Sequence, residues 1–382
     1  MHTDFQFVDD TAGIAALAER LNHEQWVAVD TEFVRERTYY PQLCLIQLST
    51  ESWCSLVDPL AKADLEPLWL ALYRSDLTKV FHAATQDLEL LTLHRDRPPE
   101  NLFDTQIAAP LIGHKDGMGY ARLVEAMTGQ VLPKDQTRAD WTQRPLPAAA
   151  LRYAANDVLY LAAIYPSIRD TLSRAGKSTW LDAEWRSLAD PSRYRRDPTT
   201  VAMRLKGLDR LSPPQQARVQ ALAAWRERTA QALDQPRGWV VSDSALYGLA
   251  RRNPDDLSAL KRVRDLKAST VAQFGDAIIA TLREAPERPL LPIRMPRRRT
   301  DSSARRTLLD TLSTHVSRIA DEHGIDPETL ASRAKLDRWL DAPAEGFDTA
   351  WRTLLLEQPL RAVLNDGVDV PGATGVASSE PR

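Results

Sequence analysis

Apolar, strand-like runs alternate with helical stretches along the first 175 residues of the chain. The runs WVAVDTEF, LCLIQLST, WCSLVDPL and TKVFHA, which begin at residues 26, 43, 53 and 78, are dense in Val, Leu and Ile. Short apolar runs bounded by turn residues are typical of β-strands. Because the first links are short, neighbouring strands there are expected to pair antiparallel. This order predicts an α/β region, with a mixed sheet flanked by helices.

Strand patterns nearly vanish after residue 175, and helical patterns replace them. We expect one helix to begin after Ser212, a second at Ser242 and a third after Ser269, because Ser is a good N-cap. A similar layout recurs about 80 residues further on. There, helices are expected from about residue 303 and from Asp326. The second half of the chain therefore predicts two all-α modules of one kind, the second of them more divergent.

Two segments do not fit a packed helical module. PLLPIRMPRRRT, which begins at residue 289, holds three prolines and four arginines and suits a linker between the modules. The stretch from residue 368 onward is rich in Gly, Ala and Ser, and we expect it to be disordered.

Length and charge place the chain in a broad class. With 382 residues, 43% of them hydrophobic and 26% charged, it is expected to be a globular protein of two or three domains. It contains no run of 18 apolar residues, and its N-terminus lacks the features of a secretory signal, so we expect a cytoplasmic protein without a membrane segment. Residues 1–180 carry a net charge of −7 (17 Lys and Arg, 24 Asp and Glu), and the remainder +4 (32 and 28). This asymmetry fits a metal-loaded part joined to one that approaches a polyanion, although a solvated basic face explains the second part almost as well.

The candidate chemistry lies in acidic residues on separate short segments. The alternation of WVAVDTEF places Asp30 and Glu32 on one face of a strand. Asp87 is expected in the first turn of a helix capped by Thr85. Taken singly, a solvated strand face explains the first pair and the helix dipole explains Asp87. Asp is nevertheless depleted in strands, and hard cations take oxygen ligands, so the acids together favour a divalent-metal site.

Tyr153 and Asp157 add a phenol and a further carboxylate. They lie four residues apart in a predicted helix and therefore share one face. An aromatic residue beside a surface acid is the simpler interpretation. A phenol above a carboxylate that holds a metal-bound water is the functional one.

These residues carry a resemblance to a known family. DTE at 30–32, HAATQD ending at Asp87, and YAAND from Tyr153 to Asp157 resemble the three exonuclease motifs of the DEDD superfamily. The longer strings TEFVRERTYYPQLCLIQ, DWTQRPL and RYAANDVLYL resemble the bacterial ribonuclease D family, and the helical modules resemble the HRDC domains of that family. In the variant with a catalytic histidine, that residue lies five before the last aspartate, which here is Arg152. The chain therefore resembles the tyrosine-type DEDDy enzymes.

The resemblance implies a ribonuclease H-like exonuclease fold followed by two HRDC-type domains. It implies six parts: the exonuclease domain (1–175), a connector (176–208), the first HRDC domain (209–288), a linker (289–301), a second, divergent HRDC-like domain (302–367) and a disordered tail (368–382).

The resemblance also implies an activity and its residues. The expected reaction is 3′→5′ hydrolysis of RNA with release of nucleoside 5′-monophosphates, in tRNA 3′-end maturation and the trimming of structured RNA, by a monomer. Two Mg²⁺ or Mn²⁺ ions would be held by Asp30, Glu32, Asp87 and Asp157, and Tyr153 would orient the attacking water. Asp104, in FDTQ, competes with Asp87 for the third ligand position, but the family pattern gives it a structural role.

Contacts to the substrate are expected at four further positions: Phe33, His82, Lys134 and Trp141. An ordinary core position is the alternative for Phe33, because alternation turns it away from the acids. His82, like His94 and His114, lacks clustered ligand spacing and is not expected to bind metal. The rival functions are a DNA 3′→5′ exonuclease, a catalytically inactive RNA-binding protein on the same scaffold, and a metal-free structural protein.

Overall fold

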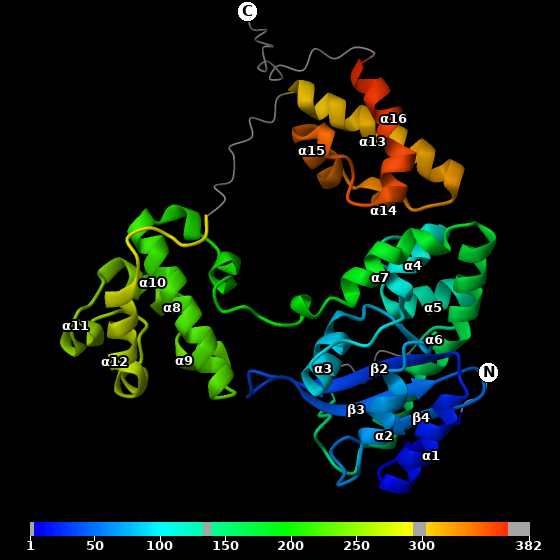
Figure 1. Ribbon diagram of the computed structural model, residues 1–382, viewed down its shortest axis with the longest axis horizontal. Coiled ribbons are helices and arrows are strands. Elements are labelled where there is room, and N and C mark those ends of the chain that lie inside the picture. The colour runs from blue at the N-terminus through cyan, green and yellow to red at the C-terminus, as the bar shows by residue number, and fades with distance from the viewer. Residues whose placement is uncertain (1–3, 133–138, 293–302, 366–382) are drawn as a thin grey trace, which may run out of the picture. The chain divides into compact units, whose positions relative to one another are not determined.

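A six-stranded mixed sheet organises the first part of the chain in the computed structural model, which describes residues 4–132, 139–292 and 303–365 (Figure 1). Its order is β1-β4-β3-β2-β5-β6. β2 pairs antiparallel with β3 and β3 with β4, while β1 with β4 and β2 with β5 pair parallel. The predicted mixed sheet with antiparallel neighbours is confirmed. The strands are β1 (Gln6–Val8), β2 (Trp26–Val34), β3 (Gln42–Ser49), β4 (Cys54–Val57), β5 (Thr78–Phe81) and β6 (Leu102–Asp104).

Helices α1, α2 and α3 belong to the same compact unit as most of this sheet, and their apolar positions lie in the core. α1, for example, is capped by Asp10, whose side chain accepts from the Gly13 N–H, and it buries Ile14, Leu17 and Leu21. None of the helices in the described ranges is long and apolar enough to cross a membrane. The helices of this part are α1 (Thr11–Asn22), α2 (Glu66–Leu72), α3 (Thr85–Arg95), α4 (Thr105–Ala108), α5 (Tyr120–Thr128), α6 (Ala148–Arg174) and α7 (Asp182–Leu188).

The start of α3 differs from the expected one. Thr85 is the first helical residue and not the N-cap, a position that Ala84 takes without a side-chain cap bond. The chain turns sharply at Ala83, whose φ is +62°, so the helix begins one residue earlier than the capping rule predicts. The predicted position of Asp87 in the first turn is confirmed.

The first helical module has its own apolar core, to which residues such as Leu222, Leu246 and Ile278 contribute. Ser212 and Ser242 cap α8 and α10 as expected. The predicted start of the third helix was wrong by two residues, because α12 begins at Ala268 with Lys267 as its N-cap. The helices of this module are α8 (Pro213–Ala232), α9 (Arg237–Val240), α10 (Asp243–Arg252), α11 (Leu257–Lys261) and α12 (Ala268–Glu284).

The end of α8 binds the loop that follows β2. The Tyr39 hydroxyl donates to Glu227 Oε1 over 2.5 Å, and it accepts from Gln231 Nε2 over 3.1 Å. The backbone N–H groups of Tyr39 and Tyr40 both donate to Asp234 Oδ1, each over 3.0 Å. One residue of the module thus satisfies two backbone donors of a loop close in sequence to Glu32, and both belong to one compact unit.

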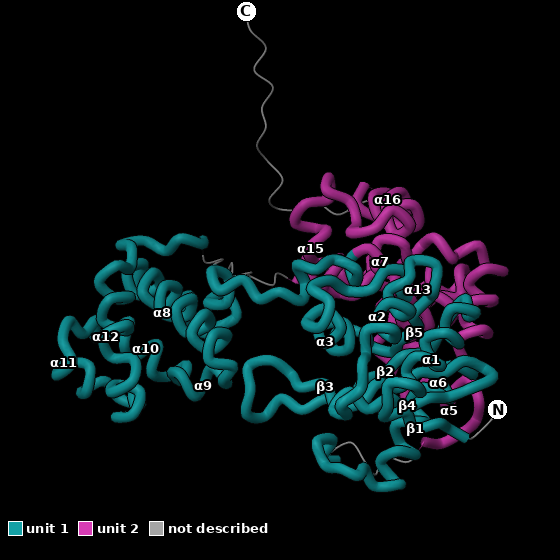
Figure 2. The backbone as a smooth tube through the Cα atoms, turned by 60° about the horizontal axis from the view of Figure 1, so that its bottom comes forward, with its two compact units in different colours: residues 1–102, 133–163, 187–298 teal, residues 103–132, 164–186, 299–382 magenta. Residues whose placement is uncertain are grey.

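The second helical module forms a compact unit with two segments of the first 186 residues (Figure 2). The Lys177 ammonium donates to the carbonyls of Leu111 and His323, and the rings of Trp180 and Trp351 stack with centroids 5.1 Å apart. The unit comprises the described residues within 103–132, 164–186 and 299–382. Its helices are α13 (Ser303–His323), α14 (Pro327–Ala331), α15 (Arg333–Asp341) and α16 (Ala350–Asn365).

This unit draws segments from both sides of the expected domain boundary, so the six-part division stays a prediction. Residues 293–301 of the expected linker and the expected tail, 368–382, lie outside the described residues.

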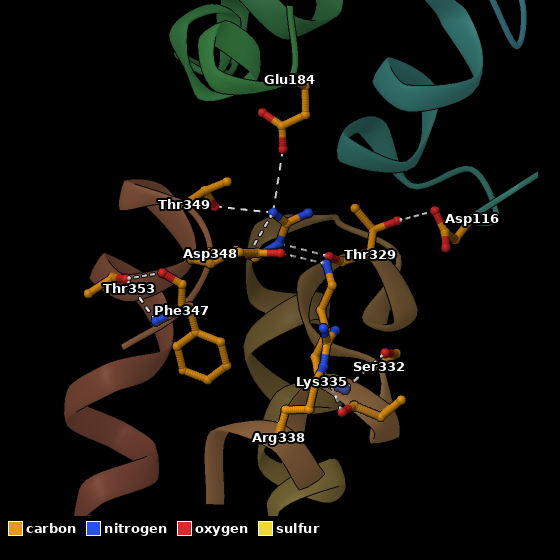
Figure 3. A network of polar contacts seen from close by, with 12 residues as sticks. Asp116, Glu184, Thr329, Ser332, Lys335, Arg338, Phe347, Asp348, Thr349 and Thr353 are labelled. Atoms are coloured by element: carbon orange, nitrogen blue, oxygen red, sulfur yellow. Dashed lines mark hydrogen bonds and ion pairs between the residues drawn. The ribbon is translucent and has the colours of Figure 1, made fainter. Parts of the chain in front are cut away.

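A buried arginine links these segments (Figure 3). Arg352 Nε donates to the carbonyl of Thr329 over 3.1 Å. Its Nη1 donates to Asp348 Oδ1 and Thr349 Oγ1, each over 3.1 Å, and to Glu184 Oε1 over 3.4 Å. Only 7% of Arg352 is exposed, so its buried charge depends on these acceptors and on the ring of Trp351, whose centroid lies 4.4 Å from the guanidinium carbon.

Arg352→Met is expected to lower the free energy of unfolding by about 2 kcal/mol, since buried acceptors lose a charged donor while much of the apolar stem is kept. The matched control is Arg361→Met in the same helix, where a side chain that is 42% exposed bonds Glu357. In Arg361→Met the loss of unfolding free energy should stay below about 1 kcal/mol. Urea unfolding of the full chain measures both. Equal, small losses would show that the Arg352 network does not stabilise the unit.

Candidate metal centre

Asp30 and Glu32 project from one face of β2, in the middle of the sheet. In the antiparallel ladder Asp30 lies opposite Gln47, and Glu32 lies opposite Leu45. The register shifts between Glu32 and Phe33. Such a bulge re-aims the residues that follow it, and it occurs here directly beyond the second acid.

α6 brings the third carboxylate to this face. Ligand oxygens of Asp30, Glu32 and Asp157 all lie within 4.8 Å of one another. Tyr153, one turn earlier in α6, hydrogen-bonds the Asp157 carboxylate, so the predicted common face of these two residues is confirmed. The site therefore combines three acids and a phenol from two elements that are distant in sequence.

Asp87 reaches the same region from α3. It is 7% exposed, and one of its oxygens accepts a 2.5 Å hydrogen bond from the hydroxyl of Thr31, which alternates to the other face of β2. Within the described ranges, the group of ligand atoms that approach within 4.8 Å comprises Asp30, Glu32 and Asp157 and does not include Asp87. Its charge nevertheless acts on Glu32 and contributes to the raised pKa of that group.

Burial is the main electrostatic influence on these acids. Burial, followed by the charges of Asp30, Asp157 and Asp87, raises the pKa of Glu32 from 4.5 to about 9. Burial and the charge of Asp30 raise the pKa of Asp157 from 3.8 to about 8, against the bond from Tyr153. Burial also raises the pKa of Asp30 to about 6. The metal-free site thus disfavours its own ionised form.

The residues present fit a divalent cation. Clustered carboxylate oxygens are the ligands of hard cations such as Mg²⁺ and Mn²⁺. A cation neutralises the charges whose mutual repulsion and burial raise these pKa values, and its binding is coupled to loss of their protons.

The residues expected to contact the substrate, and Asp104, differ in how far they are buried and in what they contact. Trp141 is 5% exposed, with its ring centroid 6.4 Å from that of Tyr153. Phe33 and His82 are half-buried. Asp104 caps α4, accepting from the Gln106 N–H over 2.9 Å, which agrees with a structural role. Lys134 lies outside the described residues.

One residue that supports this region was missed by the sequence analysis. Arg144 forms a bidentate pair with Asp58, at 2.6 and 2.7 Å, and donates to the carbonyls of Trp141 and Cys44. It therefore ties the segment that carries Trp141 to β3 and to the end of β4. Its partners are up to 100 residues away, so no local spacing could have indicated this role.

Comparison with known proteins identifies similar chains. The family profile described as 3′-5′ exonuclease matches residues 5–173, and that of the HRDC domain matches residues 215–282. The ribonuclease D of Granulibacter bethesdensis is 35% identical over 366 residues, which cover 92% of this chain and 90% of that protein. That of Zymomonas mobilis is 42% identical over 69% of this chain and 67% of that protein. The crystal structure of Escherichia coli RNase D, described as an exoribonuclease involved in structured RNA processing, has a TM-score of 0.78 and 30% identity, and the match covers 95% of this chain and 99% of that one.

The raised pKa values predict how pH acts on the metal-free protein. An acid whose pKa is higher in the folded than in the unfolded state stabilises the folded state at low pH, because the folded state binds the proton more tightly. This stabilisation is lost as pH rises from the ordinary value near 4 through the folded value of about 8 for Asp157. In EDTA, Asp157→Asn is therefore expected to raise the melting temperature more at pH 9 than at pH 5.

Added Mn²⁺ should stabilise the wild type and should have little effect on Asp157→Asn. Asp104→Ala is the control: it removes a helix cap, so it should lower stability at both pH values by about 1 kcal/mol and keep the Mn²⁺ response. Thermal melts at the two pH values measure these effects. If Asp104→Ala lost the Mn²⁺ response and Asp157→Asn kept it, the ligand assignment would be wrong.

Proposed function

The chain belongs to the ribonuclease D family of 3′-5′ exoribonucleases, and we propose that Asp30, Glu32, Asp87 and Asp157 hold the divalent cations of its active site. The observation that carries the proposal is the approach of three of these carboxylates to within 4.8 Å. Asp87 is the fourth ligand, fixed by Thr31 and close enough to act on the charge of Glu32. Two ions, Mg²⁺ or Mn²⁺, suit a set of four carboxylates.

The chain's own residues supply binding and orientation. Bound cations would contribute an activated water and charge stabilisation at the leaving oxygen of the phosphodiester. Asp30 and Glu32 fix their oxygens on a rigid central strand, and Asp157 closes the site from α6. Preorganised ligands of this kind place the reacting groups without further rearrangement of the protein.

Tyr153 acts as a hydrogen-bond donor in this site. Burial, then the charges of Asp157, Glu32 and Asp30, raise its pKa above the ordinary value of 10, so the phenol stays protonated at neutral pH. A protonated hydroxyl beside Asp157 can orient a water molecule but cannot remove its proton. Its role is therefore to position the nucleophile.

The terminal nucleotide is bound around this centre. We assign contacts with it to Phe33, His82, Trp141 and Lys134, the last of which lies outside the described residues. Trp141 is supported by its proximity to Tyr153 and by the Arg144 anchor, which fixes the loop. RNA is the substrate class, and tRNA precursors with 3′ extensions are the proposed members of it.

A basic groove on the first helical module suits the body of a structured RNA. Its lining includes Lys206, Arg210, Arg251 and Arg264, together with Tyr247. The Arg251 guanidinium lies 5.9 Å from the centroid of the Tyr247 ring. Clustered cations beside an aromatic ring are suited to phosphates and bases. The groove has a volume of about 460 Å³ and also includes the acid Asp265.

The domain organisation, the oligomeric state and the cellular location are also part of the proposal. The six-part division from residue 1 to 382 is retained, and it is supported by the exonuclease profile at 5–173 and the HRDC profile at 215–282. The protein is proposed to act as a monomer. Action on tRNA precursors supports a place in the cytoplasm.

Digestion of a tRNA with an extended 3′ end tests the function directly. The wild type should release nucleoside 5′-monophosphates from the 3′ end in Mg²⁺, and Asp30→Asn should reduce this by more than about 100-fold, since even outer partners of a metal ligand matter 10- to 100-fold. Tyr153→Phe should slow the reaction by roughly 100-fold while Mn²⁺ binding is kept.

The same assay with matched RNA and DNA strands separates an exoribonuclease from a DNA exonuclease. Faster trimming of DNA, products other than 5′-mononucleotides, or full activity of Asp30→Asn would each contradict the proposed function.

The groove predicts a separate effect on RNA affinity. Arg251→Glu combined with Arg264→Glu should weaken binding of the tRNA and flatten its salt dependence, with a slope reduced by about 1 per lost phosphate contact. Release of mononucleotides from a short oligonucleotide should be unchanged. Arg283→Glu, an exposed position in α12 of the same module, is the charge-matched control for each of the single reversals Arg251→Glu and Arg264→Glu. Equal weakening by the control would show that the groove has no specific role.

A further inference from the structure

A glutamine in the centre of the sheet has no hydrogen-bond partner for its side chain in the described part of the chain. Gln47 lies in β3 and is 0% exposed. Both polar atoms of its side chain, Nε2 and Oε1, lack a hydrogen-bond partner among the residues that the structure describes. Burying an amide without compensation costs about 1–3 kcal/mol, so a protein that keeps such a residue needs a reason for it.

Its position in the sheet suggests the reason. Gln47 is the residue directly opposite Asp30 in the antiparallel ladder of β2 and β3. Such cross-strand neighbours project from the same face, with Cβ atoms about 4.5–5.5 Å apart. The same face carries Glu32, which lies opposite Leu45. An amide without a partner therefore stands beside the acid cluster.

The neighbouring polar residues on β3 and β4 are different. Ser49, also on this face, donates to the carbonyls of Thr50 and Trp53. Ser55 in β4 is buried and its hydroxyl has no partner among the described residues, but it pairs with Leu48 and therefore lies on the other face of the sheet. Gln47 thus combines an amide without a partner with a place beside Asp30.

We infer that Gln47 is a positioning residue of the metal centre, whose side-chain amide hydrogen-bonds Asp30 and the water around a divalent cation once the cation is bound. An amide offers two N–H donors and a carbonyl acceptor, so it can serve a carboxylate and a water molecule at the same time. Mutation of residues that orient metal ligands in this way typically lowers metal affinity by about 10- to 100-fold. The inference rests on the proposed function, because it presupposes a cation at Asp30.

A purely structural role of Gln47 predicts a different effect on metal binding. If Gln47 only fills space in the core, an apolar side chain of similar volume removes an unsatisfied polar group and should stabilise the protein. Metal binding should then be unaffected. The two roles differ in a property that can be measured without catalysis.

The experiment compares Gln47→Met with Ser55→Ala in the full chain. Both changes remove a buried polar group from the same sheet, on opposite faces. Titration calorimetry gives the Mn²⁺ affinity, and melts in EDTA give the stability of the metal-free protein. Gln47→Met should weaken Mn²⁺ binding by about 10- to 100-fold while the metal-free melting temperature is kept or raised. Ser55→Ala should leave the Mn²⁺ affinity unchanged.

Wild-type Mn²⁺ affinity in Gln47→Met would overturn the inference and leave the proposed function intact. If the wild type itself bound no Mn²⁺, or Asp157→Asn bound it normally, the proposed function would fail as well. Should Gln47→Met not fold, Gln47→Leu replaces it and is judged by the same two measurements.

Discussion

The burial of several carboxylates against one another is the constraint on which the proposed active site depends. Asp30, Glu32 and Asp157 bring their oxygens within 4.8 Å in surroundings that raise the pKa of each. Without a counter-charge such a cluster opposes folding, because ions are removed from water and placed beside like charges. The scaffold must therefore hold the acids in place, and a cation must offset their charge.

The sheet meets the first requirement. β2 is an interior strand that pairs with β5 over Trp26–Ala28 and with β3 from Ala28 to Val34, and the ladder with β3 fixes the positions of Asp30 and Glu32. Thr31, which alternates to the opposite face, anchors Asp87 of α3, and α6 carries Asp157 over the acidic face. The site is thus assembled from both sides of one strand, and a shift of register by one residue would separate its members.

The helical modules do more than extend the chain. In one compact unit, Asp234 satisfies two backbone donors of the loop after β2, so the first module stabilises a segment that follows Glu32 closely in sequence. In the other unit, Arg352 joins α14 and α16 to Glu184 of the first 186 residues. Each module is therefore bonded to part of the nuclease region, and the first module also carries the basic groove proposed to bind RNA.

The sequence by itself determined the features that depend on local rules. These are the alternation that places Asp30 and Glu32 on one strand face, the helical spacing of Tyr153 and Asp157, and the serine caps of α8 and α10. Local rules misplaced the cap of α3, because they do not contain the turn at Ala83. Only the tertiary structure decided which acids approach closely, that Arg144 anchors the Trp141 segment, and that Gln47 lies opposite Asp30 with no side-chain partner among the described residues. These features depend on strand register and on contacts between residues far apart in sequence, such as Arg144 and Cys44, which are 100 positions apart, and the packing of the chain sets such contacts.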